Sequence, residues 1–362
     1  MAVTETPSKF KNFFSKLESI KLSEKIFFVQ QLGIMVKTGI SLAVALRTLA
    51  EQTSSKRFKR ILQDLQAQVE KGSLLSKSLE KYQRTFGELF INMVAAGEAS
   101  GKLEDVLNQL FIQMKKDHDI VSKVRGAMIY PAVVVVMMVV IGTAMMVYVV
   151  PNIAGVFKEL NVELPLPTRI LIFISDGILN YGLYIVVGLV ITITALMMYF
   201  RTPNGKKFLH TLILRTPIAG GIVKKINLAR FCRTLSSLLK TDIPIVQSFE
   251  ITSRILGNVI YRKALLEAKE HLKKGISIKQ SLDSYKEFFP PVVLQMIAVG
   301  EETGALDDIL EESAIFYEED VDRIMNDLPS LIEPLLITVL GVGVGGMAVA
   351  VIMPLYSISE AI

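Results

Sequence analysis

The chain has 362 residues, a formal net charge of +5, a hydrophobic fraction of 51% and a single cysteine. One cysteine excludes an internal disulfide framework. The small positive charge is spread over two polar regions, which is a weak signal for nucleic acid, and we expect no nucleic-acid partner.

Residues 1–24 are predicted to form an amphipathic tail. Apolar residues recur at helical spacing among lysines, with Phe10, Phe13, Phe14 and Leu17 on the apolar side. Two placements suit such a segment: a short helix on an anionic membrane surface, or a helix that packs on its own domain or is partly disordered. No apolar core with a small-residue cleavage site follows, so the segment is not a signal peptide.

Residues 25–130 are predicted to form a cytoplasmic, all-helical domain. Apolar residues recur at helical spacing and no strand alternation is sustained. Gly39 can end one helix and Ser41 can cap the next. A later helix is expected to stop at Gly97, and another to begin at Leu103. We interpret the domain as an antiparallel bundle of about six short helices.

Three long uncharged apolar stretches are each predicted to cross a membrane. A bilayer core requires ~20 apolar residues in a helix, and a soluble helix rarely stays uncharged for so long because one face usually meets water. We assign the spans to residues 131–151, 177–200 and 334–354. Residues 152–176 are predicted to be an extracytoplasmic loop, and residues 355–362 an extracytoplasmic tail.

Lysine and arginine are distributed unevenly along the chain. Residues 1–127 hold 20 of them and residues 201–327 hold 18, whereas residues 151–180 hold two and the last 35 residues hold none. Basic segments tend to remain in the cytoplasm. We therefore predict a cytoplasmic N-terminus, two cytoplasmic domains and an extracytoplasmic C-terminus.

The chain repeats itself, without a gap, at an offset of 203 residues. Each repeat is a helical domain followed by one span, so the second domain covers residues 201–333. The span at 177–200 has no partner and returns the chain, so that both copies enter the membrane in the same direction. The matched pairs include Phe28 with Phe231, Leu32 with Leu235, Lys37 with Lys240, Tyr82 with Tyr285, Pro131 with Pro334 and Pro151 with Pro354.

The break between the first two helices differs between the copies. Asp242 and Pro244 stand where the first copy has Gly39 and Ser41. Aspartate is a favourable N-cap residue and proline suits a first turn. We therefore expect Asp242 to cap the helix that follows it.

One stretch has some likeness to a phosphate loop, which needs glycines, a lysine for the phosphates and a hydroxyl residue for magnesium. In residues 97–103 the spacing is wrong, Leu103 replaces the hydroxyl residue, and Ala305 replaces Lys102 in the second copy. We therefore predict a turn here. No zinc-hydrolase spacing exists among the histidines, which are His118, His210 and His271. We predict no catalytic residue, no cofactor and no metal.

The pattern Gly-Glu-x-x-Gly occurs once in each repeat, and its residues are Gly97, Glu98 and Gly101, then Gly300, Glu301 and Gly304. The glutamates are expected to cap a helix N-terminus, although a docking contact is an alternative. A hard cation is a further alternative for the second copy, because several carboxylates follow. These carboxylates belong to Glu302, Asp307, Asp308, Glu311 and Glu312.

Two dipeptides open the first and third spans and complete the candidate site: Tyr130-Pro131 and Glu333-Pro334. A transporter usually has ionisable groups inside its spans, and only Glu333 approaches that condition. We interpret Glu333 as an interfacial carboxylate. Small residues at 341–345 give the third span a face for close packing, either on another span of the chain or in an oligomer.

Together these motifs resemble the platform proteins of type II secretion, the F component, and of type IV pilus assembly. The resemblance covers residues 25–356, although the stretch before the first repeat is short for the family pattern. It implies a non-enzymatic bacterial inner-membrane scaffold that couples a hexameric cytoplasmic assembly ATPase to polymerisation of a pilin or pseudopilin.

The resemblance further implies inner-membrane alignment proteins as partners, and a homo-oligomer. It does not distinguish pilus assembly from protein secretion. Two alternatives come from other classes: a small transporter or channel component, and a membrane enzyme. Ion or substrate flux in vesicles would identify the former, and an activity lost on changing one polar residue would identify the latter.

Overall fold

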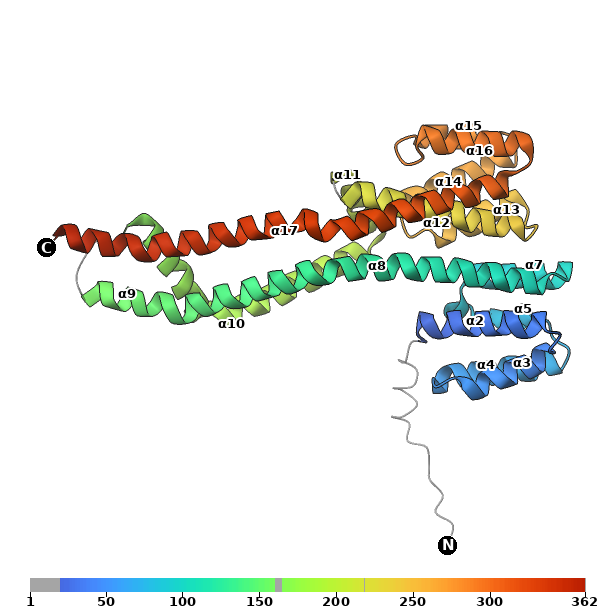
Figure 1. Ribbon diagram of the computed structural model, residues 1–362, viewed down its shortest axis with the longest axis horizontal. Helices are drawn as coiled ribbons and strands as arrows, with labels where there is room; N and C mark the ends of the chain where they lie inside the picture. Colours follow the sequence, from blue (N-terminus) through green and yellow to red (C-terminus); the bar gives the residue numbers. More distant parts are fainter. Residues whose placement is uncertain (1–19, 160–164, 218, 362) are drawn as a thin grey trace, which may run out of the picture. The chain divides into compact units, whose positions relative to one another are not determined.

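The computed structural model describes residues 20–159, 165–217 and 219–361 (Figure 1). Within those ranges the regular structure is entirely helical and no strand occurs, which confirms the all-α prediction. Most of the predicted amphipathic tail lies outside the described residues. Two compact units are formed: one from the described parts of Met1–Val121 and His210–Val321, the other from those of Ser122–Leu209 and Asp322–Ile362.

The first unit contains both repeated domains. In the first repeat the helices are α2 (Leu22–Lys37), α3 (Leu42–Gln52), α4 (Lys56–Glu70), α5 (Leu75–Glu80), α6 (Gln83–Phe86), α7 (Glu88–Ser100) and the beginning of α8 (Leu103–Ala144). In the second repeat they are α12 (Ala219–Lys240), α13 (Ile245–Ile255), α14 (Val259–Leu272), α15 (Ile278–Leu282), η2 (Asp283–Tyr285), α16 (Pro291–Thr303) and the beginning of α17 (Leu306–Ala361). Helices α13, α16 and α17 begin 203 residues after α3, α7 and α8. The duplication therefore extends to individual helix starts.

An aromatic trio lies at the core of each repeat. In the first, the rings of Phe28 and Phe58 meet edge to face with centroids 5.5 Å apart, and Phe86 lies 5.8 Å from Phe28. The matched rings of the second repeat are Phe231, Tyr261 and Phe289, with 5.2 Å between the first and last centroids. Tyr261 is fully buried, and its hydroxyl donates to the Phe288 carbonyl at 3.0 Å, which satisfies the one polar atom that the trio adds.

The turn between the first two helices of each repeat requires a left-handed residue. Gly39 has φ +80°, and Asp242 has φ +59° at the matched position. The prediction that Asp242 caps the next helix is wrong: the N-cap residue is Pro244, and neither Pro244 nor Ser41 gives a side-chain cap. Aspartate is among the few residues that tolerate this conformation. Asp242 therefore has the conformational role of Gly39 and does not cap the following helix.

The helix predicted to stop at Gly97 continues to Ser100 and ends at Gly101, which has φ +72°. Gly97 instead lies inside α7, where a Cβ would approach Val106 Cγ2 to 2.8 Å. At the matched Gly300 a Cβ would lie 2.9 Å from the Leu306 Cα. The first glycine of each pattern therefore allows close contact with the following helix, and the second ends the helix.

The second unit contains the membrane helices. Among the described residues, three helices are long and apolar enough to cross a membrane, Leu103–Gly155, Leu166–Arg201 and Leu306–Met353, which confirms the three predicted spans. The first comprises α8, a π-helical turn η1 (Met145–Val149) and the start of α9 (Val150–Glu159); the second is α10 (Leu166–Arg201). Helix α11 (Pro203–Arg215) follows α10. Large apolar side chains are exposed along these helices, as expected for a surface that faces lipid.

The helices continue beyond the apolar stretches. Pro131 lies inside α8 and Pro334 inside α17, so the prolines do not mark helix ends. The predicted loop 152–176 is helical up to Glu159 and again from Leu166. The reason is that the loss of charge marks lipid contact, whereas the backbone continues as a helix until a residue or turn stops it.

Two hydroxyl groups of α10 bond to the other membrane helices. Thr168 Oγ1 donates to the Ala350 carbonyl of α17 at 2.6 Å, and Ser175 Oγ donates to the Met146 carbonyl of η1 at 2.6 Å. Both hydroxyl residues are buried. A π-helical turn disturbs the regular backbone bonding, so the second bond satisfies a carbonyl where few other donors exist.

Candidate functional site

The twin glutamates cap helices in their own repeats. Glu98, in the last turn of α7, accepts from the backbone N–H groups of Leu75 and Ser76 at 2.6 and 3.0 Å. Glu301, in α16, accepts from the N–H of Ile278 through both oxygens at 3.1 and 3.0 Å. Each carboxylate thus meets the N-terminus of the short helix α5 or α15, where orphan donors favour a negative charge.

The two caps differ in what supports them. Helix α5 has Leu74 at its N-cap and therefore no side-chain cap of its own. Helix α15 has Ser277, whose hydroxyl accepts from the Gln280 N–H at 3.3 Å. The first repeat therefore depends more strongly on its glutamate.

Four further predicted site residues, those of the two proline dipeptides, belong to the second unit. Tyr130 is 49% exposed and Pro131 is buried, both within α8. Glu333 and Pro334 are exposed on α17. The structure places these four residues as separate positions on two membrane helices, α8 and α17.

Two of the five carboxylates considered for a cation, Asp308 and Glu311, are paired with basic side chains. Lys240 contacts Asp308 at 3.2 Å and also pairs with Glu311, which in turn lies 3.2 Å from Arg233. Among the described residues, no group of three or more His, Cys, Asp or Glu side chains is placed to hold a metal ion. The geometry favours ion pairing over a cation site.

A buried arginine is the strongest polar feature that the sequence did not reveal. Arg233 is 5% exposed and Glu318 is 4% exposed. Their side chains form a bidentate pair, with Nε–Oε1 and Nη2–Oε2 distances of 2.8 and 3.0 Å. Lys116, from the first repeat, also reaches Glu318 Oε2 at 3.1 Å. Helical periodicity does not identify a buried arginine whose partner lies 85 residues later.

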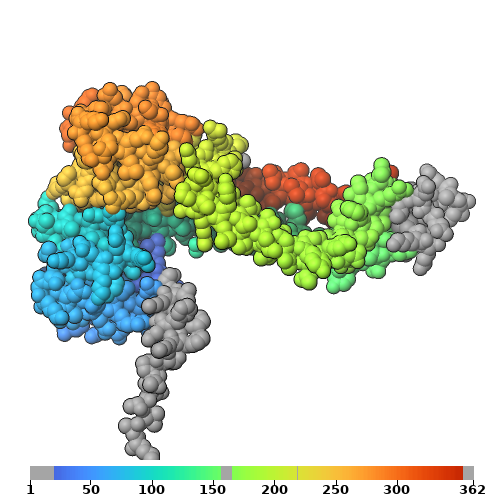
Figure 2. Space-filling model, turned by 180° about the vertical axis from the view of Figure 1, so that it is seen from behind, coloured from blue at the N-terminus to red at the C-terminus, as the bar shows by residue number. Residues whose placement is uncertain are grey.

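The two repeats meet through α7 and α8 of the first and α12 and α13 of the second (Figures 1 and 2). Gln113 of α8 donates to Thr234 Oγ1 at 3.2 Å and accepts from Ser237 Oγ at 3.5 Å. Asp117 pairs with Arg230 at 2.7 Å. Apolar residues of the second repeat continue the core of the first, among them Leu238, Ile243 and Ile251.

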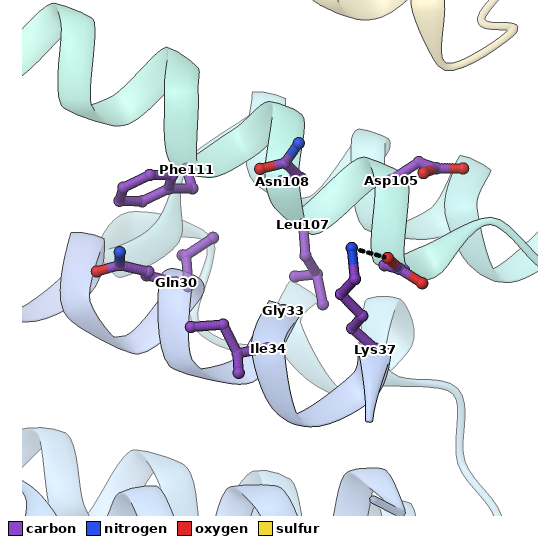
Figure 3. A pocket seen from close by; sticks show the side chains of 10 residues that line it. Gln30, Gly33, Ile34, Lys37, Asp105, Leu107, Asn108 and Phe111 are labelled. Atoms are coloured by element: carbon purple, nitrogen blue, oxygen red, sulfur yellow. Dashed lines mark ion pairs between the residues drawn. The ribbon is translucent and has the colours of Figure 1, made fainter. Parts of the chain in front are cut away.

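A groove remains open between α2 and α8 of the first repeat. Its cavity has a volume of about 340 Å³, and Gln30, Ile34 and Lys37 face Asn108 and Phe111 across it (Figure 3). Lys37 Nζ lies 3.2 Å from Glu104 at one end. The lining combines apolar, amide and charged side chains, a composition that suits binding.

The matched positions of the second repeat are filled. Arg233 replaces Gln30, and Glu311 replaces Asn108. Arg233 is buried and pairs with the partly exposed Glu311, whereas Gln30 and Asn108 are exposed. The same pair of helices therefore forms an open groove in one copy and a closed ion-pair network in the other.

Comparison with known proteins identifies one family. The family described as type II secretion system (T2SS), protein F, matches residues 28–151 and again residues 231–354. The two matches begin 203 residues apart, which confirms the internal repeat. They include all ten predicted site residues.

Relatives with two kinds of name align with nearly the whole chain. A type IV pilus assembly protein PilC of Thermus thermophilus is 36% identical over 337 residues, which cover 93% of this chain and 83% of that protein. A PilC of Pseudomonas aeruginosa is 31% identical, with 95% of this chain and 92% of that protein covered. A type II secretion system protein F of Aeromonas hydrophila is 32% identical, covering 98% and 91% respectively.

Proposed function

The chain belongs to the type II secretion system protein F family, and on that premise we propose that it is a platform protein in the inner membrane of a bacterium. It serves a type IV pilus or type II secretion machine as a scaffold and not as an enzyme. The observation that carries this proposal is the double family match, in which each copy joins a helical domain to a membrane span.

The platform has four kinds of partner in this proposal. They are a hexameric cytoplasmic assembly ATPase, a major pilin or pseudopilins, inner-membrane alignment proteins, and further copies of this chain. Relatives are named for both pilus assembly and secretion at comparable identity, 31% to 36% and 32%. The proposal therefore covers both systems.

Energy for assembly comes from the ATPase in this mechanism. The only stretch of the chain with some likeness to a phosphate loop is the end of α7, where Gly101 terminates the helix and Glu98 caps α5. These residues already have structural tasks. The ATPase cycle would rotate or lift the polar domains, and the membrane helices would move against pilin helices.

The proposed orientation follows from the distribution of basic residues. The two domains rich in lysine and arginine face the cytoplasm, as does the N-terminus, and the C-terminus faces the other side. The ATPase then meets residues 25–127 or 201–327. Pilin helices approach in the lipid, where Gly341 and Gly345 offer a small-residue face with no described neighbour within 4 Å of an added Cβ.

Co-purification from native membranes tests this function. The tagged full chain would be solubilised gently and its companions identified, with an unrelated multi-pass protein under the same tag as the control. We expect a hexameric secretion-type ATPase and pilin-like subunits to be recovered. Recovery of the chain alone, across several mild detergents and after cross-linking, would contradict the proposal and favour flux assays for a transporter.

A second measurement tests the contact with the ATPase. Photo-cross-linkers would be placed at exposed positions in residues 25–127 and 201–327, and matched ones in the membrane helices. We expect adducts with the ATPase from the first set only. A working system in which the ATPase contacts neither range would contradict the coupling mechanism.

A further inference from the structure

The two repeats meet through different surfaces, although their folds match. The first repeat contributes α7 and α8, and the second contributes α12, α13 and Glu318 of α17. If a two-fold axis related the two repeats, the equivalent contact would also form, with α2 and α3 of the first repeat packed against α16 and α17 of the second. Apart from the contacts of Glu318 and Asp322 with α8, the outer faces of α2, α3, α16 and α17 are exposed among the described residues. Such a head-to-tail contact can be repeated by another copy.

The first unpaired surface is the outer face of α2 and the turn to α3. Ile34 is 49% exposed, whereas its match Ser237, in the contact between the repeats, is 2% exposed. Ile40 is 40% exposed and its match Ile243 is 4% exposed. Phe27, at 50% exposed, extends this apolar face.

The second unpaired surface is formed by α16 and α17. Phe316 is 62% exposed, whereas its match Gln113 is 6% exposed in the contact between the repeats. Val292 and Val299 are 68% and 42% exposed. Their matched residues in α7 are only partly exposed, because the second repeat covers that helix. Large apolar side chains are thus exposed where the first repeat buries a contact.

We propose that a second copy of this chain joins these two surfaces, with α16 and α17 of one copy packed on α2 and α3 of the next. The contact has the arrangement that the two repeats have within one chain. Phe316 then takes the place of Gln113 and meets Ile34 and Gln31, which match Ser237 and Thr234. A buried polar contact inside the chain becomes an apolar contact between chains.

Charge favours the same partner. Inside the chain, Lys116 pairs with Glu318 at 3.1 Å. The residues that match them in the proposed contact are Glu319 and Lys115, a pair of opposite sign with the charges exchanged, and both side chains are exposed. The two surfaces are therefore complementary in charge as well as in apolar character.

The direction in which the repeats enter the membrane is compatible with a second copy of the chain packing on these surfaces. Both repeats continue into a membrane helix, and in the proposed orientation both enter in the same direction. A second copy inserted in the same membrane has the same orientation, so its domains lie on the same side of the bilayer. The inference rests on the proposed platform function, which includes further copies of this chain as partners, and it specifies the surfaces through which those copies meet.

Paired cysteines test the contact in native membranes. Cys232 is buried, and burial raises the pKa of its thiol to about 12, so it gives little background reaction. Two differently tagged full-length chains would be co-expressed, one with Ile34→Cys and the other with Phe316→Cys, and then oxidised. We expect a disulfide between the two tags, because the matched residues Ser237 and Gln113 are in contact.

The pattern of products separates this arrangement from others. Either variant expressed alone should give no dimer, and Leu266→Cys, which replaces an exposed α14 residue, should not cross-link to Phe316→Cys. Dimers of Ile34→Cys with itself would indicate a two-fold pairing and overturn the proposal. Absence of any product, or protection of Ile34→Cys by residues 1–19 or by the ATPase, would overturn it as well.

Substitutions provide a second test. We expect Phe316→Asp to lower the cross-linked fraction of an Ile40→Cys and Val299→Cys pair roughly tenfold, as for a central aromatic anchor, whereas Leu266→Asp should leave it unchanged. Glu319→Lys should lower it about two- to fivefold, and Lys115→Glu added to Glu319→Lys should restore it. Failure of both substitutions to change the product would overturn the proposal.

These outcomes are distinct from those for the platform function. If cross-linking fails while ATPase and pilin still co-purify, the self-association surface is wrong and the platform stands. If cross-linking succeeds while no partner co-purifies, the contact between copies stands and the platform function is contradicted.

Discussion

The groove between α2 and α8 and the matched junction between α12 and α17 use the same helices in opposite ways. The first is open, with Gln30 and Asn108 exposed. The second is closed by the buried Arg233, held by Glu318. Both repeats keep the left-handed glycine that ends α7 or α16 and the glutamate that caps α5 or α15, although Asp242 replaces the left-handed Gly39. Duplication has therefore preserved the helix connections and changed the residues where the copies meet.

The largest expected difference between the repeats concerns the buried arginine. Arg233→Met should destabilise the protein by about 3 kcal/mol, the lower end for removing one partner of a buried pair, because Lys116 still reaches Glu318. Gln30→Met, at the matched exposed position, should change stability little. Thermal unfolding of the solubilised full chain would measure both, and equal midpoints for the two variants would contradict the comparison.

The next prediction concerns the glycines that allow close helix contact. Gly97→Ala and Gly300→Ala should each cost about 1–3 kcal/mol, because a Cβ would approach neighbouring atoms to 2.8 and 2.9 Å. The loss should be larger for Gly300, whose neighbour is a backbone atom. Gly221→Ala, in α12 with nothing within 4 Å, is the matched control and should be neutral or slightly stabilising. Midpoints that do not separate the control from the other two would contradict the packing argument.

The capping glutamates should differ in importance. Glu98→Ala should cost about 1–2 kcal/mol, since α5 has no other side-chain cap. Glu301→Ala should cost less, because Ser277 still caps α15. Adding Ser277→Ala to Glu301→Ala should then remove the difference. Limited proteolysis near residues 75–80 and 278–283 would report local loosening, and equal cleavage in the two single variants would argue against this account.

The smallest expected effect is on the loss of folding stability at acidic pH. Hydrogen bonds from Lys81 and Tyr82 lower the pKa of Asp64, and one from Tyr285 lowers the pKa of the matched Glu267. A lowered pKa in the folded state means that stability is present at neutral pH and is lost as the pH falls below the ordinary carboxyl value of about 4. Asp64→Asn and Glu267→Gln should each weaken this dependence slightly. Unchanged slopes of the unfolding midpoint against pH would contradict the prediction.

Much of the architecture could be predicted from the sequence, because it depends on composition and periodicity. Charge-free stretches identified three spans, and an ungapped offset identified the repeat. The end of α7 was misplaced because a glycine at 97 has two uses, ending a helix or allowing close contact, and only the neighbouring Val106 distinguishes them. Asp242 was misjudged for a similar reason, since aspartate serves both caps and left-handed turns.

The contacts of the candidate site were less predictable, because they join residues distant in the chain. Glu98 was expected to cap a helix N-terminus, but the helix is one that begins 23 residues earlier. The pair formed by Arg233 and Glu318 leaves no sequence pattern. An internal repeat in the sequence also does not show which of the two repeats has an exposed surface, because exposure depends on how the two repeats pack on each other.

The two hydroxyl bonds of α10 have a consequence for how such a chain arose. The middle span has no counterpart in the duplication, yet Thr168 and Ser175 connect it to each of the duplicated spans. A gene fusion that added only a linker would need a way to return the chain across the bilayer. Here the returning helix is also hydrogen-bonded to both duplicated spans, and the continuous chain keeps the two repeats together independently of concentration.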